Sequence, residues 1–350
     1  MAFDHGVTGK QALQRLVYQD LKGRGLSARP ALQVIRKVAD AYTSLRANIR
    51  AGNLGPENSS RRVKAGSKPI RFRPDAAQPF DDRCLSWQHD ACTVSIWSTA
   101  GRLKGVRFAG SLDHLSTLVA HRKGETDLVH RDGMWLLIAT CDIPQPEVVD
   151  PVGWLGVDLG IVNIATTSDG CRATGRRLNR HRRRMAGLRR KLQAKGTKSA
   201  KRVLKRVRRR EARFVTDTNH TISKRHVTLA QRTCRGIGLE DLAGIRDRAR
   251  LRKPQRVMPH SWAFAQYGAF VVYKAARAGV PVVFVDPRDT SRTCFRCRHV
   301  DKRNRRGQAL FVCRHCGYRA HADHNASHNI GHRAGEVWNA GRQSSVPAAA

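Results

Sequence analysis

The chain has 350 residues, enough for two or three domains that each bury a hydrophobic core. Its 66 lysine and arginine residues face only 27 acidic ones, and the formal net charge of +39 favours an anionic partner, above all nucleic acid. An apolar fraction of 40% excludes a wholly disordered basic tail, and no apolar run approaches the roughly 18 residues of a membrane span. The start of the chain lacks the pattern of an export signal, so we expect a cytoplasmic protein in a reducing compartment.

The first part of the chain changes its apolar period twice. Spacings of three and four predict two amphipathic helices in a domain over residues 1–52. Residues 52–68 are rich in Gly, Ser and charge, which predicts a mobile connection. From residue 66 to 145 the period becomes two, which predicts a β-rich domain with a hairpin turn at Asp132 and Gly133.

The second part of the chain reads as a mixed domain over residues 151–290, with the element order β-β-α-β-α-β. Residues 172–233 are expected to form its basic helices, with a bend near Gly196. We expect a cysteine-rich module at 291–319, a further segment of the mixed domain at 320–332 and a flexible tail at 333–350.

The basic helices are the strongest candidate for nucleic-acid binding. Between residues 172 and 210, 19 of 39 residues are Lys or Arg and none is acidic. The alternative is a solvated charge run without a partner, as most such runs are. So many cations in one helical pair favour a phosphate backbone that neutralises them, and the residues we expect to bind it are Arg176, Arg177, Arg180, Arg183, Arg184, Arg190, Lys191, Lys201, Arg202, Lys205, Arg206 and Arg209.

The nine cysteines fall into two groups. Four form two CxxC pairs separated by fifteen residues, a spacing typical of a Zn²⁺ site with four thiolate ligands: Cys294, Cys297, Cys313 and Cys316. Four thiolates leave no open coordination position, so this zinc is expected to be structural rather than catalytic. The alternative, a thioredoxin-like redox pair, needs a single CxxC at the start of a helix. The other five are expected to be small buried side chains: Cys84, Cys92, Cys141, Cys171 and Cys234.

Three acidic residues are candidates for catalysis. Asp158 lies inside an apolar strand, Glu240 ends the apolar GIGL segment, and Asp323 directly follows the cysteine module. Taken singly, they could be an ion-pair partner, a solvated side chain and a helix N-cap. Together they supply the hard oxygen ligands that two Mg²⁺ ions need for phosphodiester hydrolysis.

A family resemblance rests on three segments, GVDLGIVNIATT, GLEDLAG and TSRTCFRCRHVDKRNRRGQALFVCRHCGYRAHADHNASHNI. They resemble the three RuvC motifs and the zinc ribbon of TnpB (OrfB) proteins, transposon-encoded RNA-guided DNA nucleases related to type V CRISPR effectors. The resemblance is specific from about residue 150 to 332 and looser over the helical and β-rich front.

The resemblance implies a multidomain α+β protein. Its RNase H-like (RuvC) α/β nuclease domain carries an inserted zinc ribbon and follows a helical recognition lobe and a β-rich wedge barrel. Asp158, Glu240 and Asp323 are then the catalytic Mg²⁺ ligands. The implied partners are a guide RNA encoded near the transposon end and a target DNA, without a membrane, at the nucleoid. Proteins of the family usually begin with a strand of the wedge barrel. Because helices are predicted almost from the first residue here, we expect the helical recognition lobe over 1–52 to be truncated at its N-terminus.

Two alternatives remain open for the function. The same three acids could serve a DNA transposase that performs strand transfer, because a 3′-hydroxyl can replace water as the nucleophile. The chain could also be a catalytically decayed relic that only binds nucleic acid. An RNA that copurifies with the protein favours the nuclease, and binding without Mg²⁺-dependent cleavage identifies the relic.

Overall fold

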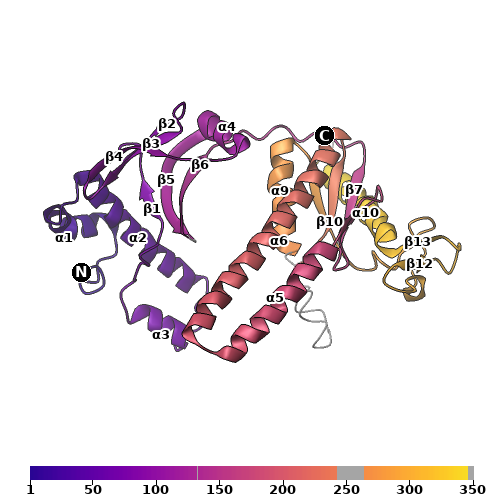
Figure 1. The fold of residues 1–350 in the computed structure, drawn as a ribbon. Coiled ribbons are helices and arrows are strands. Elements are labelled where there is room, and N and C mark those ends of the chain that lie inside the picture. The colour runs from indigo at the N-terminus through magenta and orange to yellow at the C-terminus, as the bar shows by residue number, and fades with distance from the viewer. Residues whose placement is uncertain (132, 243–263, 346–350) are drawn as a thin grey trace. The chain divides into compact units, whose positions relative to one another are not determined.

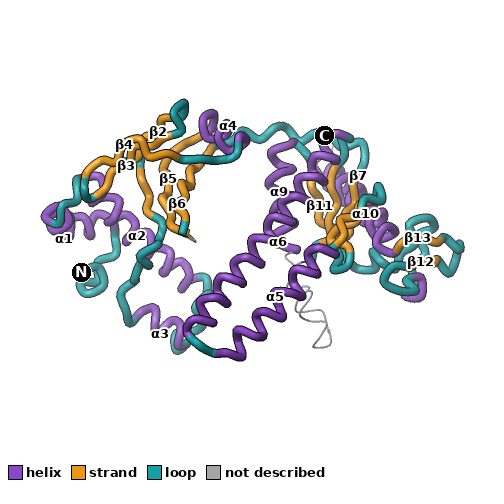
Figure 2. Tube along the Cα trace, in the orientation of Figure 1, coloured by secondary structure: helices purple, strands orange, loops and turns teal. Residues whose placement is uncertain are grey.

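The protein is described here from a computed structural model that covers residues 1–131, 133–242 and 264–345 (Figure 1). The chain divides into two compact units, Met1–Pro144 and Gln145–Ala350. Both mix helices and sheets (Figure 2). Within the described ranges, no helix is both long enough and apolar enough to cross a membrane.

Unit 1 begins with two packed helices, as the apolar spacing predicts. Helix α1 spans Lys10–Gly23 and α2 spans Ala28–Arg50. Their core contains Leu13, Ile35 and Ala39. The segment expected to be a mobile connection instead contains helix α3, Ser60–Gly66, because the Ser59 hydroxyl caps it by accepting from the Arg62 amide at 3.2 Å.

The rest of unit 1 is β-rich, as predicted. One antiparallel sheet has the strand order β1-β5-β6 and the other β2-β3-β4. Leu85, Val94 and Ile96 of the second sheet pack with Leu128 and Leu137 of the first in one core. The elements are β1 (Gln78–Phe80), β2 (Leu85–Gln88), β3 (Thr93–Ser98), β4 (Gly101–Arg107), α4 (Leu112–His121), β5 (Arg122–Arg131) and β6 (Met134–Cys141).

One expected feature of this part is not confirmed and another is present. Among the described residues no ladder joins the two sheets, so a closed barrel is not confirmed. The expected hairpin is β5-β6, and Gly133 adopts φ +83° at its turn, a conformation that favours glycine. The other expected turn residue, Asp132, lies outside the described residues.

Unit 2 is built on a five-stranded mixed sheet with the order β11-β10-β7-β8-β9. Strands β7, β10 and β11 are parallel, and β8 and β9 add antiparallel partners at the other edge. The short strand β9 is an additional strand that the predicted element order does not include. The strands are β7 (Trp154–Leu159), β8 (Asn163–Thr167), β9 (Arg172–Thr174), β10 (Gly236–Glu240) and β11 (Val282–Val285).

Helices cover both faces of this sheet (Figure 1). Leu155, Val157 and Leu239 point toward α6 and α9 and share a core with Tyr267 and Val271. On the other face α10 lies against β7 and β10. The helices are α5 (Arg176–Lys195), α6 (Lys198–Arg232), α9 (Phe264–Ala278) and α10 (Ala322–Ser345).

The predicted basic helices are α5 and α6. Their junction is at Gly196, which caps α5 with φ +64°, so the predicted bend is confirmed. The helix predicted for 261–279 is α9, and residues 261–263 lie outside the described residues. A flexible tail is expected from residue 333, but helix α10 continues to Ser345. Ile330 and Ala334 hold this helix by packing against β11.

The cysteine module contains little regular structure. It consists of the 3-10 helix η1 (Lys302–Asn304) and the short antiparallel strands β12 (Leu310–Val312) and β13 (Arg319–His321). Outside the module, the prediction of five buried cysteines is wrong for Cys171 and Cys234, which are exposed. Cys84 is buried, and the remaining two are half-buried.

We predict that the glycine contacts between the sheet and α10 are essential for stability. A Cβ at Gly156 would collide with the backbone of Ser327 and Gly331, so Gly156→Ala should lower the free energy of unfolding by about 3 kcal/mol. Gly187→Ala in α5 is the matched control, because a Cβ there meets nothing within 4 Å and should stabilise by about 0.5 to 1 kcal/mol. Urea unfolding measures both, and similar effects would contradict this packing.

Candidate functional site

The fold brings the three predicted acids to one region of unit 2. Strands β7 and β10 are parallel, with Leu239 opposite Val157, so the next residues along each strand, Glu240 and Asp158, lie across from one another. Gly156 and Gly238, two residues before the acids, face α10. Since side chains alternate along a strand, both acids project from that same face. The third acid, Asp323, lies in the first turn of α10.

Neutral donors hold two of these carboxylates. Asp323 is 5% exposed, and its Oδ2 accepts a hydrogen bond from Asn163 Nδ2 at 2.9 Å. Glu240 Oε1 accepts from Thr290 Oγ1 at 2.5 Å. Thr290 lies in a turn five residues after the end of β11, whereas Asn163 begins β8. Each carboxylate is therefore oriented by an element distant in the sequence.

Arg305 is a cation that acts on all three carboxylates, and the charge of Arg333 also acts on Glu240. One guanidinium nitrogen of Arg305 lies 3.7 Å from Asp323 Oδ1, and its charge also acts on Asp158 and Glu240. Arg305 follows η1 in the cysteine module, so the module reaches the carboxylates directly. Sequence analysis missed Arg305 because it lies in the basic run KRNRR, where nothing distinguishes it from its neighbours.

The cluster is electrostatically unfavourable on its own. Burial raises the pKa of Asp158 well above its ordinary value of 3.8, the charges of Glu240 and Asp323 raise it further, and Arg305 opposes the shift. Burial also raises the pKa of Glu240, opposed by the Thr290 hydrogen bond. A bound cation relieves this strain, and three carboxylates are the hard oxygen ligands that Mg²⁺ accepts. The donor set therefore fits a divalent cation.

The four predicted thiolate ligands form a tight quartet. Their Sγ atoms all lie within 4.8 Å of one another, which makes this a group that can hold zinc: Cys294, Cys297, Cys313 and Cys316. Among the described residues, the three carboxylates do not form a group with all ligand atoms this close together. Gly317 directly follows the second CxxC pair. Its positive φ of +71° lets the chain turn tightly at this point.

Two buried asparagines attach the first knuckle to α10. The Phe295 amide donates to Asn325 Oδ1 at 3.0 Å. Asn329 Nδ2 donates to the carbonyls of Thr290 at 2.9 Å and Thr293 at 2.7 Å. The helix that carries Asp323 therefore also holds the start of the cysteine module. It holds the backbone of the residue that orients Glu240 as well.

The predicted phosphate-binding residues are all exposed on α5 and α6. Two other arginines of this pair have structural roles instead. Arg182 is buried, and Arg189 forms an ion pair with Glu211 across the two helices. The twelve predicted residues therefore lie at the surface of the two helices, and their binding to phosphate stays a prediction.

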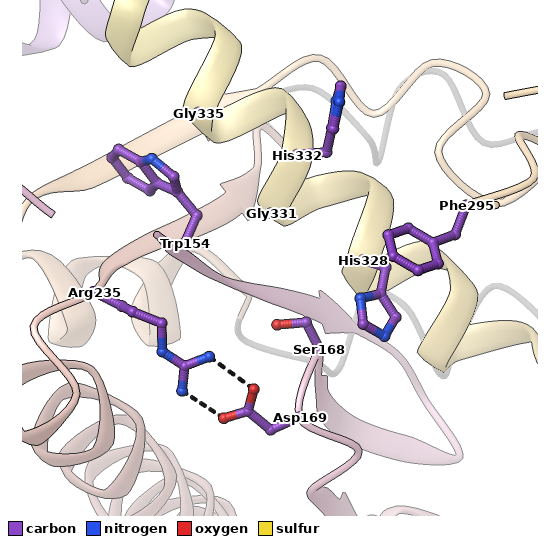
Figure 3. Close-up of a pocket in the computed structure, with 9 residues that line it drawn as sticks. All are labelled: Trp154, Ser168, Asp169, Arg235, Phe295, His328, Gly331, His332 and Gly335. Carbon is purple, nitrogen blue, oxygen red and sulfur yellow. Dashed lines mark hydrogen bonds and ion pairs between the residues drawn. The ribbon is translucent and has the colours of Figure 1, made fainter. Parts of the chain in front are cut away.

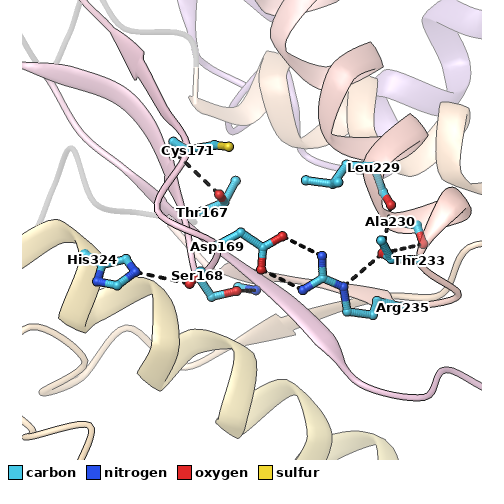
Figure 4. Close-up of polar contacts among 10 residues, drawn as sticks. Thr167, Ser168, Asp169, Cys171, Leu229, Ala230, Thr233, Arg235 and His324 are labelled. Atoms are coloured by element: carbon cyan, nitrogen blue, oxygen red, sulfur yellow. Dashed lines mark hydrogen bonds and ion pairs between the residues drawn. The ribbon is translucent and has the colours of Figure 1, made fainter.

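An open pocket of about 390 Å³ lies beside α10, and none of the three carboxylates is among its lining residues (Figure 3). Its lining includes Trp154, His328 and the ion pair of Arg235 with Asp169, whose two hydrogen bonds measure 2.7 and 2.5 Å (Figure 4). This pair ties the β8-β9 turn to the start of β10. The residues that line the pocket thus have structural roles in holding the turn and the strand together, and we assign the pocket no function.

Comparisons with known proteins agree with these features. Residues 138–244 match the family model of OrfB from IS605, described as a probable transposase, and residues 264–330 match the Cas12f1-like TNB domain. The chain's resemblance to the TnpB/OrfB family is confirmed.

Several curated relatives align with this chain. The CRISPR-associated endodeoxyribonuclease Cas12f1 of Sulfoacidibacillus thermotolerans is 33% identical over 225 residues, which cover 59% of this chain and 52% of the relative. The putative RNA-guided DNA endonuclease InsQ of Escherichia coli (strain K12) is 28% identical, with coverages of 57% and 56%. The TnpB-like protein MJ0751 of Methanocaldococcus jannaschii is 34% identical, with coverages of 35% and 43%. The chain spans about half the length of these relatives.

Among solved structures, a Cas12f1-sgRNA-target DNA complex aligns with a TM-score of 0.43 and 15% identity, covering 92% of this chain and 90% of that one.

The raised pKa of Asp158 predicts an unusual pH dependence of stability. Above pH 3.8 the unfolded state binds fewer protons at this carboxyl than the folded state, so its contribution to stability falls as the pH rises toward the folded-state pKa. In magnesium-free buffer at pH 7, Asp158→Asn should therefore be more stable than the wild type by about 1 to 2 kcal/mol. The difference should vanish below about pH 4.

Asp169→Asn is the control of opposite sign. The hydrogen bonds from Arg235 lower the pKa of Asp169, so its stabilising effect is present at neutral pH and is lost as the pH falls. This variant should be less stable at pH 7. Urea unfolding across this pH range measures both, and equal stability of Asp158→Asn and the wild type at pH 7 would contradict the strain in the cluster.

The cysteine quartet predicts a zinc content of about one ion per chain. Cys313→Ser removes one thiolate and should lose most of the bound zinc and lower the melting temperature of the protein. Cys171→Ser is the matched control, because Cys171 is exposed and lies outside the quartet. Metal analysis after dialysis measures both, and full zinc content in Cys313→Ser would refute the site.

Proposed function

We propose that the chain is an RNA-guided, Mg²⁺-dependent DNA endonuclease encoded by a transposable element. The observation that carries this proposal is the convergence of Asp158, Glu240 and Asp323 beside α10, in a chain with an OrfB-type segment and a Cas12f1-like TNB domain. The relatives named as endodeoxyribonuclease and RNA-guided DNA endonuclease support the same activity.

The sheet of unit 2 supports an RNase H-like (RuvC) domain. Three antiparallel strands, β7 to β9, continue into two parallel ones, β10 and β11, with helices on both faces. Acids at the ends of the two central strands then share one edge with the start of α10. In unit 1, we assign the two packed sheets to a wedge domain and the α1-α2 pair to a recognition lobe for the guide RNA.

The three carboxylates are the proposed Mg²⁺ ligands. When bound there, Mg²⁺ supplies the positive charge that activates a water and stabilises the leaving oxygen of a phosphodiester. The protein's own groups prepare the site. Thr290 and Asn163 hold Glu240 and Asp323 by neutral hydrogen bonds that leave the negative charge available. Arg305 presents guanidinium donors beside them, suited to the oxygens of an arriving phosphate.

The proposed zinc site has a structural role. Four thiolate ligands leave no position for a substrate, so zinc stabilises the module from which Arg305 reaches the carboxylates. Zinc therefore acts on cleavage only through the position of this module.

Exposed cations on α5 and α6 are the proposed contacts to nucleic-acid backbone, the partners being a guide RNA and a target DNA. Each neutralised phosphate releases counterions, so affinity should fall steeply with salt. In RNA-guided effectors, base pairing reads the target sequence while the protein contacts the backbone. Contacts of this kind need a high density of exposed Lys and Arg, as these helices provide.

The test begins with the protein purified from its native host and sequencing of any bound RNA. We expect a discrete RNA that directs Mg²⁺-dependent cleavage of complementary DNA. Asp158→Ala should reduce cleavage by at least about 10³-fold while nucleic-acid affinity stays equal or increases, because a repulsive carboxylate is removed. Exposed Asp75→Ala is the control and should cleave normally.

Each other outcome points elsewhere. Joined rather than hydrolysed DNA ends would support the transposase. Random RNA and salt-sensitive binding without cleavage would support the relic. Full cleavage by Asp158→Ala would exclude the proposed site.

A further inference from the structure

Neutral hydrogen-bond donors serve two of the three carboxylates but not the third. Asn163 donates to Asp323, and Thr290 donates to Glu240. Among the described residues, no side chain or backbone group donates to the carboxylate of Asp158. The metal site of the proposed function is therefore incomplete in its supporting hydrogen bonds.

Thr166 is the residue placed to complete it. In the antiparallel pair of β7 and β8, Thr166 lies directly opposite Asp158. Side chains of directly opposite residues project from the same face, with their Cβ atoms about 4.5 to 5.5 Å apart. For this pair that face is the one covered by α10, where the three acids converge.

The Thr166 hydroxyl is buried without a partner. The residue is 1% exposed, and within the described part of the chain its Oγ1 makes no hydrogen bond. The two residues that follow it differ, since Thr167 Oγ1 donates to the Cys171 carbonyl at 3.4 Å and Ser168 Oγ accepts from the Gly156 amide at 3.2 Å. Burying a hydroxyl without a bond is unfavourable, so such a group needs an explanation.

Thr126 is a second buried threonine with an unpaired hydroxyl, and it lies outside the candidate site, which makes it a useful comparison. It is also 1% exposed, with Oγ1 unpartnered among the described residues, and lies in β5 of unit 1. Its cross-strand partners are Phe80 and Ala139, whose side chains offer no acceptor. Thr166 differs because one of its partners carries a carboxylate.

We propose that Thr166 is a positioning residue for the metal site: its hydroxyl donates to the Asp158 carboxylate and orients it when Mg²⁺ binds. This inference rests on the proposed function and assigns each of the three ligands one neutral donor. Outer groups of this kind fix the direction of a ligand's lone pairs without cancelling its charge. Their removal typically costs 10- to 100-fold in metal affinity.

The test compares Thr166→Val, which keeps the shape but removes the hydroxyl, with Thr166→Ser, which keeps the hydroxyl. Zinc-loaded full-length protein without nucleic acid is titrated with Mn²⁺, and binding is followed by electron paramagnetic resonance. Thr166→Val should bind Mn²⁺ about 10-fold more weakly, and Thr166→Ser should bind like the wild type. The cleavage assay should show the same split, with a higher Mg²⁺ requirement for Thr166→Val and a recovered rate at saturating Mg²⁺.

Stability should change in the opposite direction from metal affinity. Thr166→Val removes an unpaired buried hydroxyl, so without divalent ions its melting temperature should rise by about 2 to 4 °C. Thr126→Val is the matched control and should gain stability with unchanged Mn²⁺ affinity. A hydroxyl with only a structural role would change stability and leave metal binding alone.

The possible outcomes separate this inference from the function on which it rests. Unchanged Mn²⁺ affinity in Thr166→Val, or an equal loss in Thr166→Ser, would overturn the role of the hydroxyl while the carboxylate site stands. If wild-type protein and Asp158→Ala bind Mn²⁺ equally, the carboxylate site itself is wrong and the inference falls with it.

Discussion

The close approach of α10 to the sheet is the contact on which the rest of unit 2 depends. Gly156 and Gly238 have no side chains to hold the helix away, and a Cβ at Gly238 would lie 2.8 Å from the Cβ of Ala334. On the helix, Gly331 also allows this close approach, because a Cβ there would lie 3.1 Å from the Trp154 carbonyl oxygen. The acids of β7 and β10 come two residues after these glycines. The contact that seats the helix therefore also sets where Asp323 stands relative to them.

The same helix mounts the cysteine module. Asn325 and Asn329 are almost completely buried, and both use their amides to hold the backbone of the first knuckle. Arg305 of the module in turn lies next to Asp323, at the start of the same helix. A shift of the module would move both the cation and the backbone of Thr290, which binds Glu240. The thiolate and carboxylate sites are therefore linked through contacts to the same helix.

The large positive charge of the chain does not neutralise the acid cluster. Exposed charges are screened within about 10 Å at ordinary salt, so the cations of α5 and α6 act mainly on anions at their own surface. The carboxylates are desolvated and repel one another, which Arg305 only partly offsets. Two kinds of electrostatic demand thus exist in one chain. An exposed positive surface suits phosphates, and a buried negative site suits a metal cation.

Sequence patterns predicted the features that depend on local spacing. The CxxC pairs, the basic helices and an acid inside an apolar strand can be recognised without the fold, and the structure brings the four cysteines together, forms the helices and buries the acid. The supporting contacts could not be predicted in this way. Asn163 and Asp323 are 160 residues apart, and Thr290 and Glu240 are 50 apart, so only the folded chain pairs them.

The C-terminal helix shows why the structure differs from the predicted flexible tail over 333–345, the described part of that range. Gly331, Gly335 and Gly341 lower helix propensity, and they favour a flexible tail over 333–350 when only the sequence is considered. In the fold, Gly331 and Gly335 face β7, where a Cβ would lie only 3.1 to 3.2 Å from the backbone or the ring of Trp154. The burial of Ile330 and Ala334 compensates for the low propensity. The glycines that weaken this helix in isolation are thus the residues that let it reach the sheet and carry Asp323 to the other acids.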